Sequence, residues 1–195
     1  MNAKTIALAA GVALNASGAG ACFLEMDIGR GMVTSDPLAS PVLVAARNAI
    51  DDGHAIPLDM RDKSRMSSAV ALQSYLPRVI DGATVKAPQV RFSVLQAQSG
   101  YWTRYVIMDG KVHTEAHRLE PGEVEAILVV ADSALLPVLI GEASPEDLRR
   151  QGLVRARGVD SEKALDAFEA LLASFGETRL AQRMRENPRK LWPEG

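Results

Sequence analysis

The alternation of apolar and polar side chains predicts a group of β-strands in the middle of the chain. Within residues 89–98, Val90, Phe92 and Val94 fall on one face. Arg91 and Ser93 fall on the other face, which is typical of a half-buried strand. Three further runs, each apolar or rich in β-branched and aromatic residues, follow at 101–108, 111–117 and 124–131. We therefore expect four consecutive strands joined by hairpins, which is an antiparallel meander.

The turns between these runs have the composition that hairpins require. Asp109-Gly110 is the strongest signal, because both central residues of a type I′ turn adopt positive φ, which Asp tolerates and Gly favours. Ser99-Gly100 and the Glu-Pro-Gly-Glu sequence at 120–123 are predicted to be turns as well. The last run, 124–131, is mostly apolar, so we expect it to be a central strand of the sheet.

Apolar residues recur at helical spacing on both sides of the strands. Before the strands, 41–49 and 64–80 are predicted helices, and Pro77 should kink or end the second one. After the strands, a helix is expected over 134–140, with Asp132 or Ser133 as its cap.

Two more helices are expected towards the C-terminus. Ser144-Pro145 provides a cap and a first residue for a helix that ends at Gly152. A short alternating strand over 153–157 follows it. Asp160-Ser161 should then cap a helix over 162–175. The apolar face of this last helix consists of Ala164, Leu165, Phe168, Leu171, Leu172 and Phe175.

Together these elements predict an α+β fold, in which an antiparallel meander is covered by amphipathic helices. Residues 35–195 are expected to form one domain, with a basic C-terminal tail over 177–195. Residues 1–34 form a separate N-terminal segment, which the turn-rich stretch 35–41 joins to the domain.

Two interpretations of residues 1–21 stay open. Ala19-Gly20-Ala21 fits the pattern of small residues before a signal-peptidase cut, which would make Cys22 the first mature residue. Asn15 and Ser17 interrupt the apolar stretch and weaken this interpretation. The alternative is an apolar strand or helix at the start of a cytoplasmic domain. The sequence thus leaves the location open between the cytoplasm and the periplasm or the exterior.

Charge and composition narrow the functional classes. The 195 residues include 22 Lys and Arg against 24 Asp and Glu, and 5% are aromatic, so the chain has neither the charge nor the stacking rings that favour nucleic acid. Cys22 is the sole cysteine, which excludes an internal disulfide and a thiolate metal cluster. The common hydrolase, nucleotide-binding and zinc-protease motifs do not occur in the sequence. We therefore expect no catalytic residues, no metal and no cofactor.

An enzyme with a site outside the known motifs remains an alternative. His113 and His117 flank Glu115, and on a helix they would share a face. We expect a strand here, in which residues four apart lie about 13 Å from each other, too far to bind one metal ion. A solvated strand edge is the expected role of these histidines.

From residue 89 onward, the order of the elements resembles that of the sterol carrier protein type 2-like domain. The similarity rests on Asp109-Gly110 and on 131–175, where Ala131-Asp132 is followed by LLPVLIG, Ser144-Pro145 and GLVRARG. One departure is Val159, which stands between Gly158 and Asp160, where the family usually has Gly followed directly by Asp. A second departure is the long segment before the first strand. Bacterial members are mostly cytoplasmic, which opposes the signal-peptide interpretation.

The resemblance implies an apolar tunnel between sheet and helices that binds fatty acyl chains, sterols or isoprenoid lipids, with no catalytic residues. The first hypothesis is therefore non-enzymatic binding or transfer of a small lipophilic molecule. The alternative is an accessory subunit of a larger complex that binds no ligand. We expect the ligand to contact Phe92, Val94, Trp102, Val106, Ile127, Val129, Leu135, Leu139, Phe168 and Leu172.

The C-terminal tail interleaves cations with apolar residues. This pattern predicts contact with an anionic membrane surface or an acidic protein partner, with a tryptophan as the anchor. A solvated, frayed helix is the alternative. The residues expected to make the contact are Arg179, Arg183, Arg185, Arg189, Lys190 and Trp192.

Overall fold

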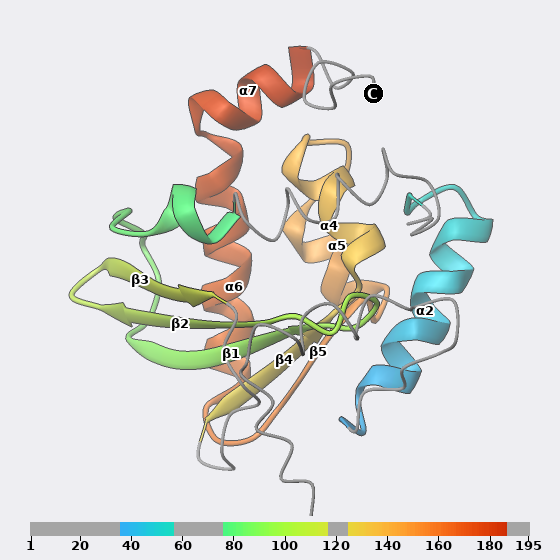
Figure 1. The fold of residues 1–195 in the computed structure, drawn as a ribbon, viewed down its shortest axis with the longest axis horizontal. Helices are drawn as coiled ribbons and strands as arrows, with labels where there is room; N and C mark the ends of the chain where they lie inside the picture. The colour runs from blue at the N-terminus through green and yellow to red at the C-terminus, as the bar shows by residue number, and fades with distance from the viewer. Residues whose placement is uncertain (1–35, 57–75, 117–124, 187–195) are drawn as a thin grey trace, which may run out of the picture.

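The fold combines a five-stranded sheet with a long helix that crosses it and shorter helices beside it (Figure 1). The computed structural model describes residues 36–56, 76–116 and 125–186. The strands are β1 (Val90–Gln96), β2 (Trp102–Met108), β3 (Lys111–Ala116), β4 (Ala126–Val130) and β5 (Val154–Arg157). The helices are α2 (Ala39–Asp51), α4 (Asp132–Leu139), α5 (Pro145–Arg150), α6 (Ser161–Gly176) and α7 (Arg179–Glu186), and residues 76–80 are also helical.

The sheet has the order β3-β2-β1-β4-β5 and is mixed. Strands β1 and β2, β2 and β3, and β4 and β5 pair antiparallel, whereas β1 and β4 pair parallel. The predicted meander is therefore wrong, because β4 lies beside β1 and not beside β3. All five residues of β4 are buried, so this strand belongs in the interior of the sheet, where a parallel neighbour is common. The prediction that this apolar run is a central strand is confirmed.

The second hairpin is as the sequence predicts. Asp109 and Gly110 have φ values of 51° and 72°, so both adopt the positive φ of a type I′ turn. Gly100, in the preceding turn, has φ 73°. These turns place β1, β2 and β3 in register, with Phe92 opposite Tyr105 and Tyr105 opposite Thr114.

The helices agree with their predicted positions more closely than with their predicted caps. Helix α5 begins at the expected cap, Ser144, which forms a capping box with Asp147: each side chain accepts a hydrogen bond from the other residue's backbone N–H. The expected caps of α4 are wrong, because its N-cap is Ala131 and makes no side-chain bond. Asp160 is the N-cap of α6 but makes no side-chain capping hydrogen bond; its backbone is left-handed, with φ 59°, whereas N-cap residues are typically extended.

The second predicted helix is described only in part. Residues 64–75 lie outside the described residues, whereas 76–80, which include Pro77, are helical. At the N-terminal end of α2, the buried Asp36 carboxylate accepts hydrogen bonds from the Arg157 guanidinium at 2.8 and 3.1 Å. This ion pair ties the start of α2 to the end of β5.

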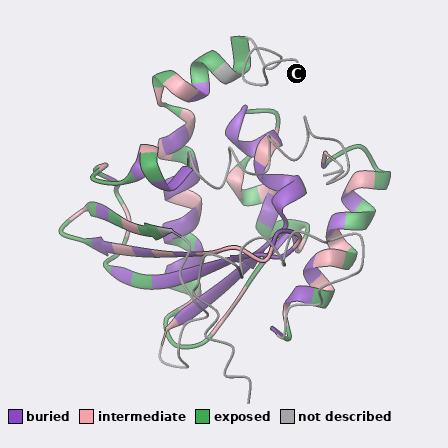
Figure 2. Ribbon diagram, viewed as in Figure 1, coloured by how far each residue is buried: buried purple, intermediate pink, exposed green. Residues whose placement is uncertain are grey.

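Most buried residues lie in the sheet and on the sides of α4 and α6 that face it (Figure 2). Helix α6 contacts β1, β4 and β5, and all six residues of its predicted apolar face are buried. Three rings mark the contact between helix and sheet: the Phe92 centroid lies 5.3 Å from Tyr105 and 6.4 Å from Phe168. None of the described helices is long and apolar enough to cross a membrane.

Candidate functional site

The residues expected to bind the ligand divide between the two faces of the sheet. Six of them lie on the side of α4 and α6: Phe92, Val94, Leu135, Leu139, Phe168 and Leu172. The other four lie on the opposite face, because the register pairs them with β1 residues that alternate with Phe92 and Val94: Trp102, Val106, Ile127 and Val129. The structure therefore does not bring all ten together, and ligand binding at these residues stays a prediction.

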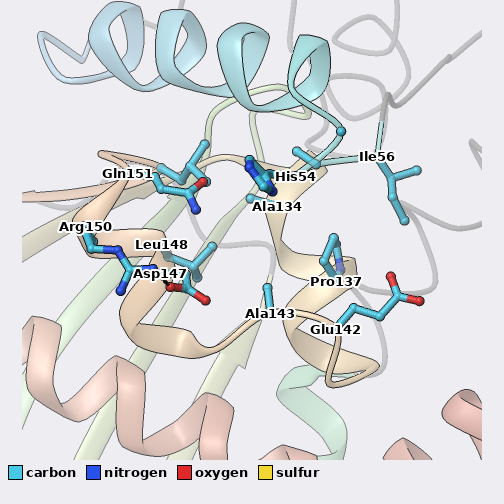
Figure 3. A pocket seen from close by; sticks show the side chains of 13 residues that line it. His54, Ile56, Ala134, Pro137, Glu142, Ala143, Asp147, Leu148, Arg150 and Gln151 are labelled. Carbon is cyan, nitrogen blue, oxygen red and sulfur yellow. Dashed lines mark hydrogen bonds and ion pairs between the residues drawn. The ribbon is translucent and has the colours of Figure 1, made fainter.

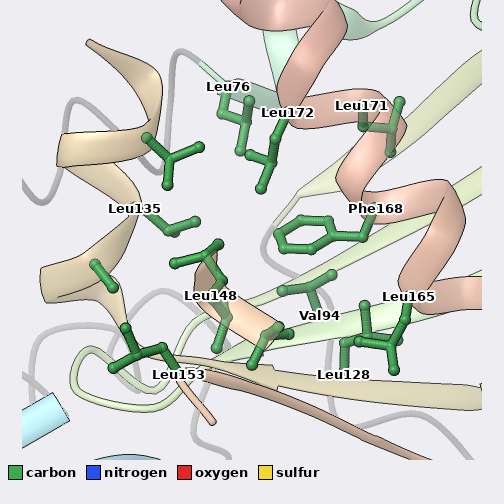
Figure 4. Close-up of a cluster of buried hydrophobic side chains, with 14 of the residues drawn as sticks. Leu76, Val94, Leu128, Leu135, Leu148, Leu153, Leu165, Phe168, Leu171 and Leu172 are labelled. Atoms are coloured by element: carbon green, nitrogen blue, oxygen red, sulfur yellow. The ribbon is translucent and has the colours of Figure 1, made fainter. Parts of the chain in front are cut away.

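The group on the helix side continues into a larger cluster of leucines (Figure 4). Side chains from α4, α5, α6 and the sheet point towards one another there, and Leu135, Leu148 and Leu172 are each at most 2% exposed. Leu76, from helical residues 76–80, and Leu153, just before β5, belong to the same buried cluster. This leucine cluster is an apolar interior bounded on one side by the sheet and on the other by several separate helices.

A hollow of about 260 Å³ lies between the end of α2, α4 and α5, and it opens beside this interior (Figure 3). No pattern in the sequence predicts this hollow, because its walls come from segments about 80 residues apart. Its apolar floor includes Ala134, Leu148 and Leu153, which also belong to the buried core. The full lining is Gly53, His54, Ala55, Ile56, Ala134, Pro137, Glu142, Ala143, Asp147, Leu148, Arg150, Gln151 and Leu153. We call this space the α2–α4–α5 hollow.

Polar side chains stand around the rim of the α2–α4–α5 hollow. Asp147 accepts a hydrogen bond from the Ser144 N–H at 2.9 Å and forms an ion pair with Arg150. These hydrogen bonds with Ser144, and to a smaller extent Arg150 and His54, hold the pKa of Asp147 below its ordinary value. Glu142 lies on the far side of the hollow from Arg150 (Figure 3). The arrangement offers an apolar floor and a polar rim, which suits a small amphiphile.

A second hollow, of about 410 Å³, lies at the end of the sheet where β1 and β4 begin and β2 ends. Two exposed apolar side chains, Met108 and Val159, line it together with Arg91. It is more open than the first hollow, and the Glu125 carboxylate in its lining is bound to Arg104 and Ser93.

Asp132 lies in a buried polar network at the other end of β1. Its carboxylate accepts hydrogen bonds from the Gln98 N–H at 2.8 Å, the Ser99 N–H at 3.3 Å and the Ser99 hydroxyl at 2.6 Å. Burial raises the pKa of Asp132, and these hydrogen bonds oppose the rise. Gln98 also bonds to Ser133 through its amide, so the network joins the first turn of the sheet to α4. These contacts give Asp132 a structural role.

The basic tail is described as far as Glu186. Arg179, Arg183 and Arg185 are exposed on α7, and Arg185 donates a hydrogen bond to the Gly176 carbonyl at 3.0 Å. The other three contact residues of the predicted tail lie outside the described residues: Arg189, Lys190 and Trp192. Contact with a membrane or a partner stays a prediction.

The histidine pair is also described only in part. His113 is exposed on β3, whereas His117 lies outside the described residues. In the described parts of the chain, no three His, Cys, Asp or Glu side chains are grouped so that they could hold a metal ion.

No family model matches this chain, and no curated protein matches its sequence. Among solved structures, it is similar to the stereoselective inverting sec-alkylsulfatase Pisa1 from Pseudomonas sp., with 14% identity and a TM-score of 0.33 over 42% of this chain and 12% of that one. A double mutant of the same sulfatase gives 14% identity and a TM-score of 0.34 over 63% and 20% of the two chains. The chain thus spans a small part of the sulfatase's length.

A third similar structure is the ubiquinone synthesis protein UbiJ-SCP2, with 14% identity and a TM-score of 0.31 over 56% of this chain and 93% of that one. Its name includes the sterol carrier protein 2 domain that the sequence resembles. Similarities at this level establish neither a shared fold nor a shared function.

Proposed function

We propose that this protein binds a small lipophilic molecule, such as a fatty acyl, sterol-like or isoprenoid compound, without changing it chemically. The ligand enters the α2–α4–α5 hollow and contacts the leucine cluster behind it. The observation that carries the proposal is the shared floor: Leu148 and Leu153 line the hollow and also belong to the buried cluster. A molecule in the hollow therefore lies against the outer side of the apolar interior, with Leu148 and Leu153 between them.

The size of the hollow favours a small molecule or one end of a longer one. Sites for drug-sized ligands usually measure about 300–1,000 Å³, and this hollow measures about 260 Å³. Each methylene group moved from water into such a place contributes about 0.8 kcal/mol, so five contribute about 4 kcal/mol before ordering costs. A longer tail requires the leucine side chains to move apart.

The two helices beside the hollow, α4 and α5, are short and are each followed by a glycine turn. Helix α4 has eight residues with Pro137 inside it, and α5 has six residues. Gly141 and Gly152 follow these two helices with φ values of 78° and 70°, which are accessible to glycine at little cost. Short helices joined by glycine turns can shift while the hydrogen-bonded sheet stays intact.

The first test is native mass spectrometry of the protein purified from its own host, followed by addition of dodecanol. We expect either a co-purified lipid mass or a saturable dodecanol adduct. A well-folded chain that carries no lipid and takes up no dodecanol would contradict the proposal.

A pair of alanine substitutions locates the site. Ala143→Leu adds three carbon atoms at a half-buried position that lines the hollow, whereas Ala87→Leu adds them at a half-buried position in a loop outside both hollows. We expect Ala143→Leu to weaken dodecanol binding and Ala87→Leu to leave it unchanged, with both variants checked for folding by circular dichroism. Equal binding by the two variants would place the ligand elsewhere.

A further inference from the structure

The charged groups on the rim of the α2–α4–α5 hollow do not balance one another. Asp147 is already engaged by the Ser144 N–H and by Arg150, so this acid and this cation neutralise each other. Glu142 has no hydrogen bond or ion pair to its carboxylate from the described part of the chain. It stands in the lining beside Pro137 and away from Arg150 (Figure 3). Among the described residues that line the hollow, Glu142 is therefore the one carboxylate without a hydrogen-bonded or ion-paired partner.

We infer that the polar end of the bound molecule is a cation, so that the preferred ligand is an amphiphile of the alkylamine type and not a free fatty acid. This inference rests on the proposed function, because it concerns the polar end of the same ligand. An ammonium group at the rim pairs with Glu142, while its apolar chain lies against Pro137, Ala134 and Leu148. A carboxylate in the same place meets the like charge of Glu142 and finds Arg150 already paired with Asp147.

The preference is modest because Glu142 is exposed to water. At the surface, solvent and salt screen a pair of opposite charges, so the expected gain in affinity is about five-fold over an uncharged ligand of equal length. The preference also decreases as the salt concentration rises.

Three soluble ligands with the same six-carbon chain test the inference: 1-hexanol, n-hexylamine and hexanoate. Their affinities are measured by NMR titration at pH 8 and low salt, where amines are charged and histidine side chains are usually neutral. We expect hexanol to bind, hexylamine to bind about five-fold more tightly, and hexanoate to bind more weakly than hexanol.

Two variants assign the preference to one carboxylate. Glu142→Gln removes the charge while keeping the shape, and we expect it to bring hexylamine to the affinity of hexanol. Glu146→Gln removes the same charge from an exposed position on α5 that does not line the hollow, and we expect the preference for the amine to remain.

The outcomes separate the two proposals. If the native protein binds none of the three ligands, the proposed function itself is contradicted. If hexanol binds but hexylamine gains nothing, or if the amine preference survives in Glu142→Gln, the cationic ligand is refuted while lipophilic binding stands.

Discussion

Removing the Asp132 carboxylate should destabilise the fold more than removing any exposed acid. Its two oxygens accept three hydrogen bonds, two from the backbone N–H groups of Gln98 and Ser99 and one from the Ser99 hydroxyl. In Asp132→Ala, the buried Ser99 N–H loses its partner. Gln98 is only half-buried, so water can replace part of its loss, and the Ser99 hydroxyl can donate its proton to the Gln96 side-chain oxygen instead.

The expected loss of folding free energy in Asp132→Ala follows from these lost hydrogen bonds. A buried donor left without a partner costs about 1–3 kcal/mol, and the half-buried donor adds a smaller amount, which gives about 3 kcal/mol in total. That is about a hundred-fold change in the folding equilibrium. Asp132→Asn keeps one acceptor oxygen and should cost less, about 1–2 kcal/mol.

Urea unfolding followed by circular dichroism measures these costs. With a slope of about 2 kcal/mol per molar urea, Asp132→Ala should lower the midpoint by about 1.5 M. The control is Asp166→Ala, because Asp166 is an exposed acid on α6 that pairs with Arg149 and should change stability by less than about 1 kcal/mol. Equal midpoints for the native protein and Asp132→Ala would refute the structural role of this carboxylate.

The pH dependence of the folding stability provides a second check on the role of Asp132. Burial raises the pKa of Asp132 in the folded state, so the unfolded chain ionises first as the pH rises from about 4. The folded state then loses stability until the pH passes the folded pKa. Asp132→Asn does not titrate, so the stability advantage of the native protein over this variant should shrink as the pH rises above about 4. A constant or growing difference would contradict the raised pKa.

Two further predictions concern the sheet. Leu128→Ala and Ile127→Ala remove fully buried side chains from neighbouring positions of β4, and each should cost about 2–5 kcal/mol in urea unfolding. Only Leu128 faces the leucine cluster, so only its substitution should change the affinity for dodecanol. Equal changes in affinity for the two variants would contradict the binding of dodecanol on the helix side of the sheet. Gly158→Ala should cost more than about 2 kcal/mol, because Gly158 has φ 91° and an added Cβ would lie 2.7 Å from a backbone oxygen. Gly100→Ala, at φ 73° with open space, should cost about 1 kcal/mol, and equal losses in the two glycine variants would refute the clash.

Part of the candidate site could be anticipated from sequence, and part could not. The apolar faces of α6 and β1 were evident from spacing, and Phe92, Val94, Phe168 and Leu172 do meet on the helix side. Alternation within β2 and β4 shows which residues share a face but not which face turns towards the helices. For this reason the sequence does not reveal that Trp102, Val106, Ile127 and Val129 lie on the face opposite Phe92 and Val94.

Features that depend only on neighbouring residues could be predicted from the sequence. The positive φ angles of Asp109 and Gly110, the capping box at Ser144 and the burial of one stripe of α6 all follow from local sterics, local hydrogen bonds and helical period. These interactions span at most a few residues, so a short stretch of chain is enough to specify them.

Contacts between distant segments could be recognised only in the folded structure. Strand β4 could form its backbone hydrogen bonds beside β3 or beside β1. Pairing with β1 places β4 where all five β4 residues are buried. Asp132 was expected to cap its own helix, yet it binds a turn more than thirty residues earlier. The α2–α4–α5 hollow likewise exists only where three helices converge. Such contacts are chosen by the packing of the whole domain, because many pairings are locally equivalent and differ only in the surface that they bury together.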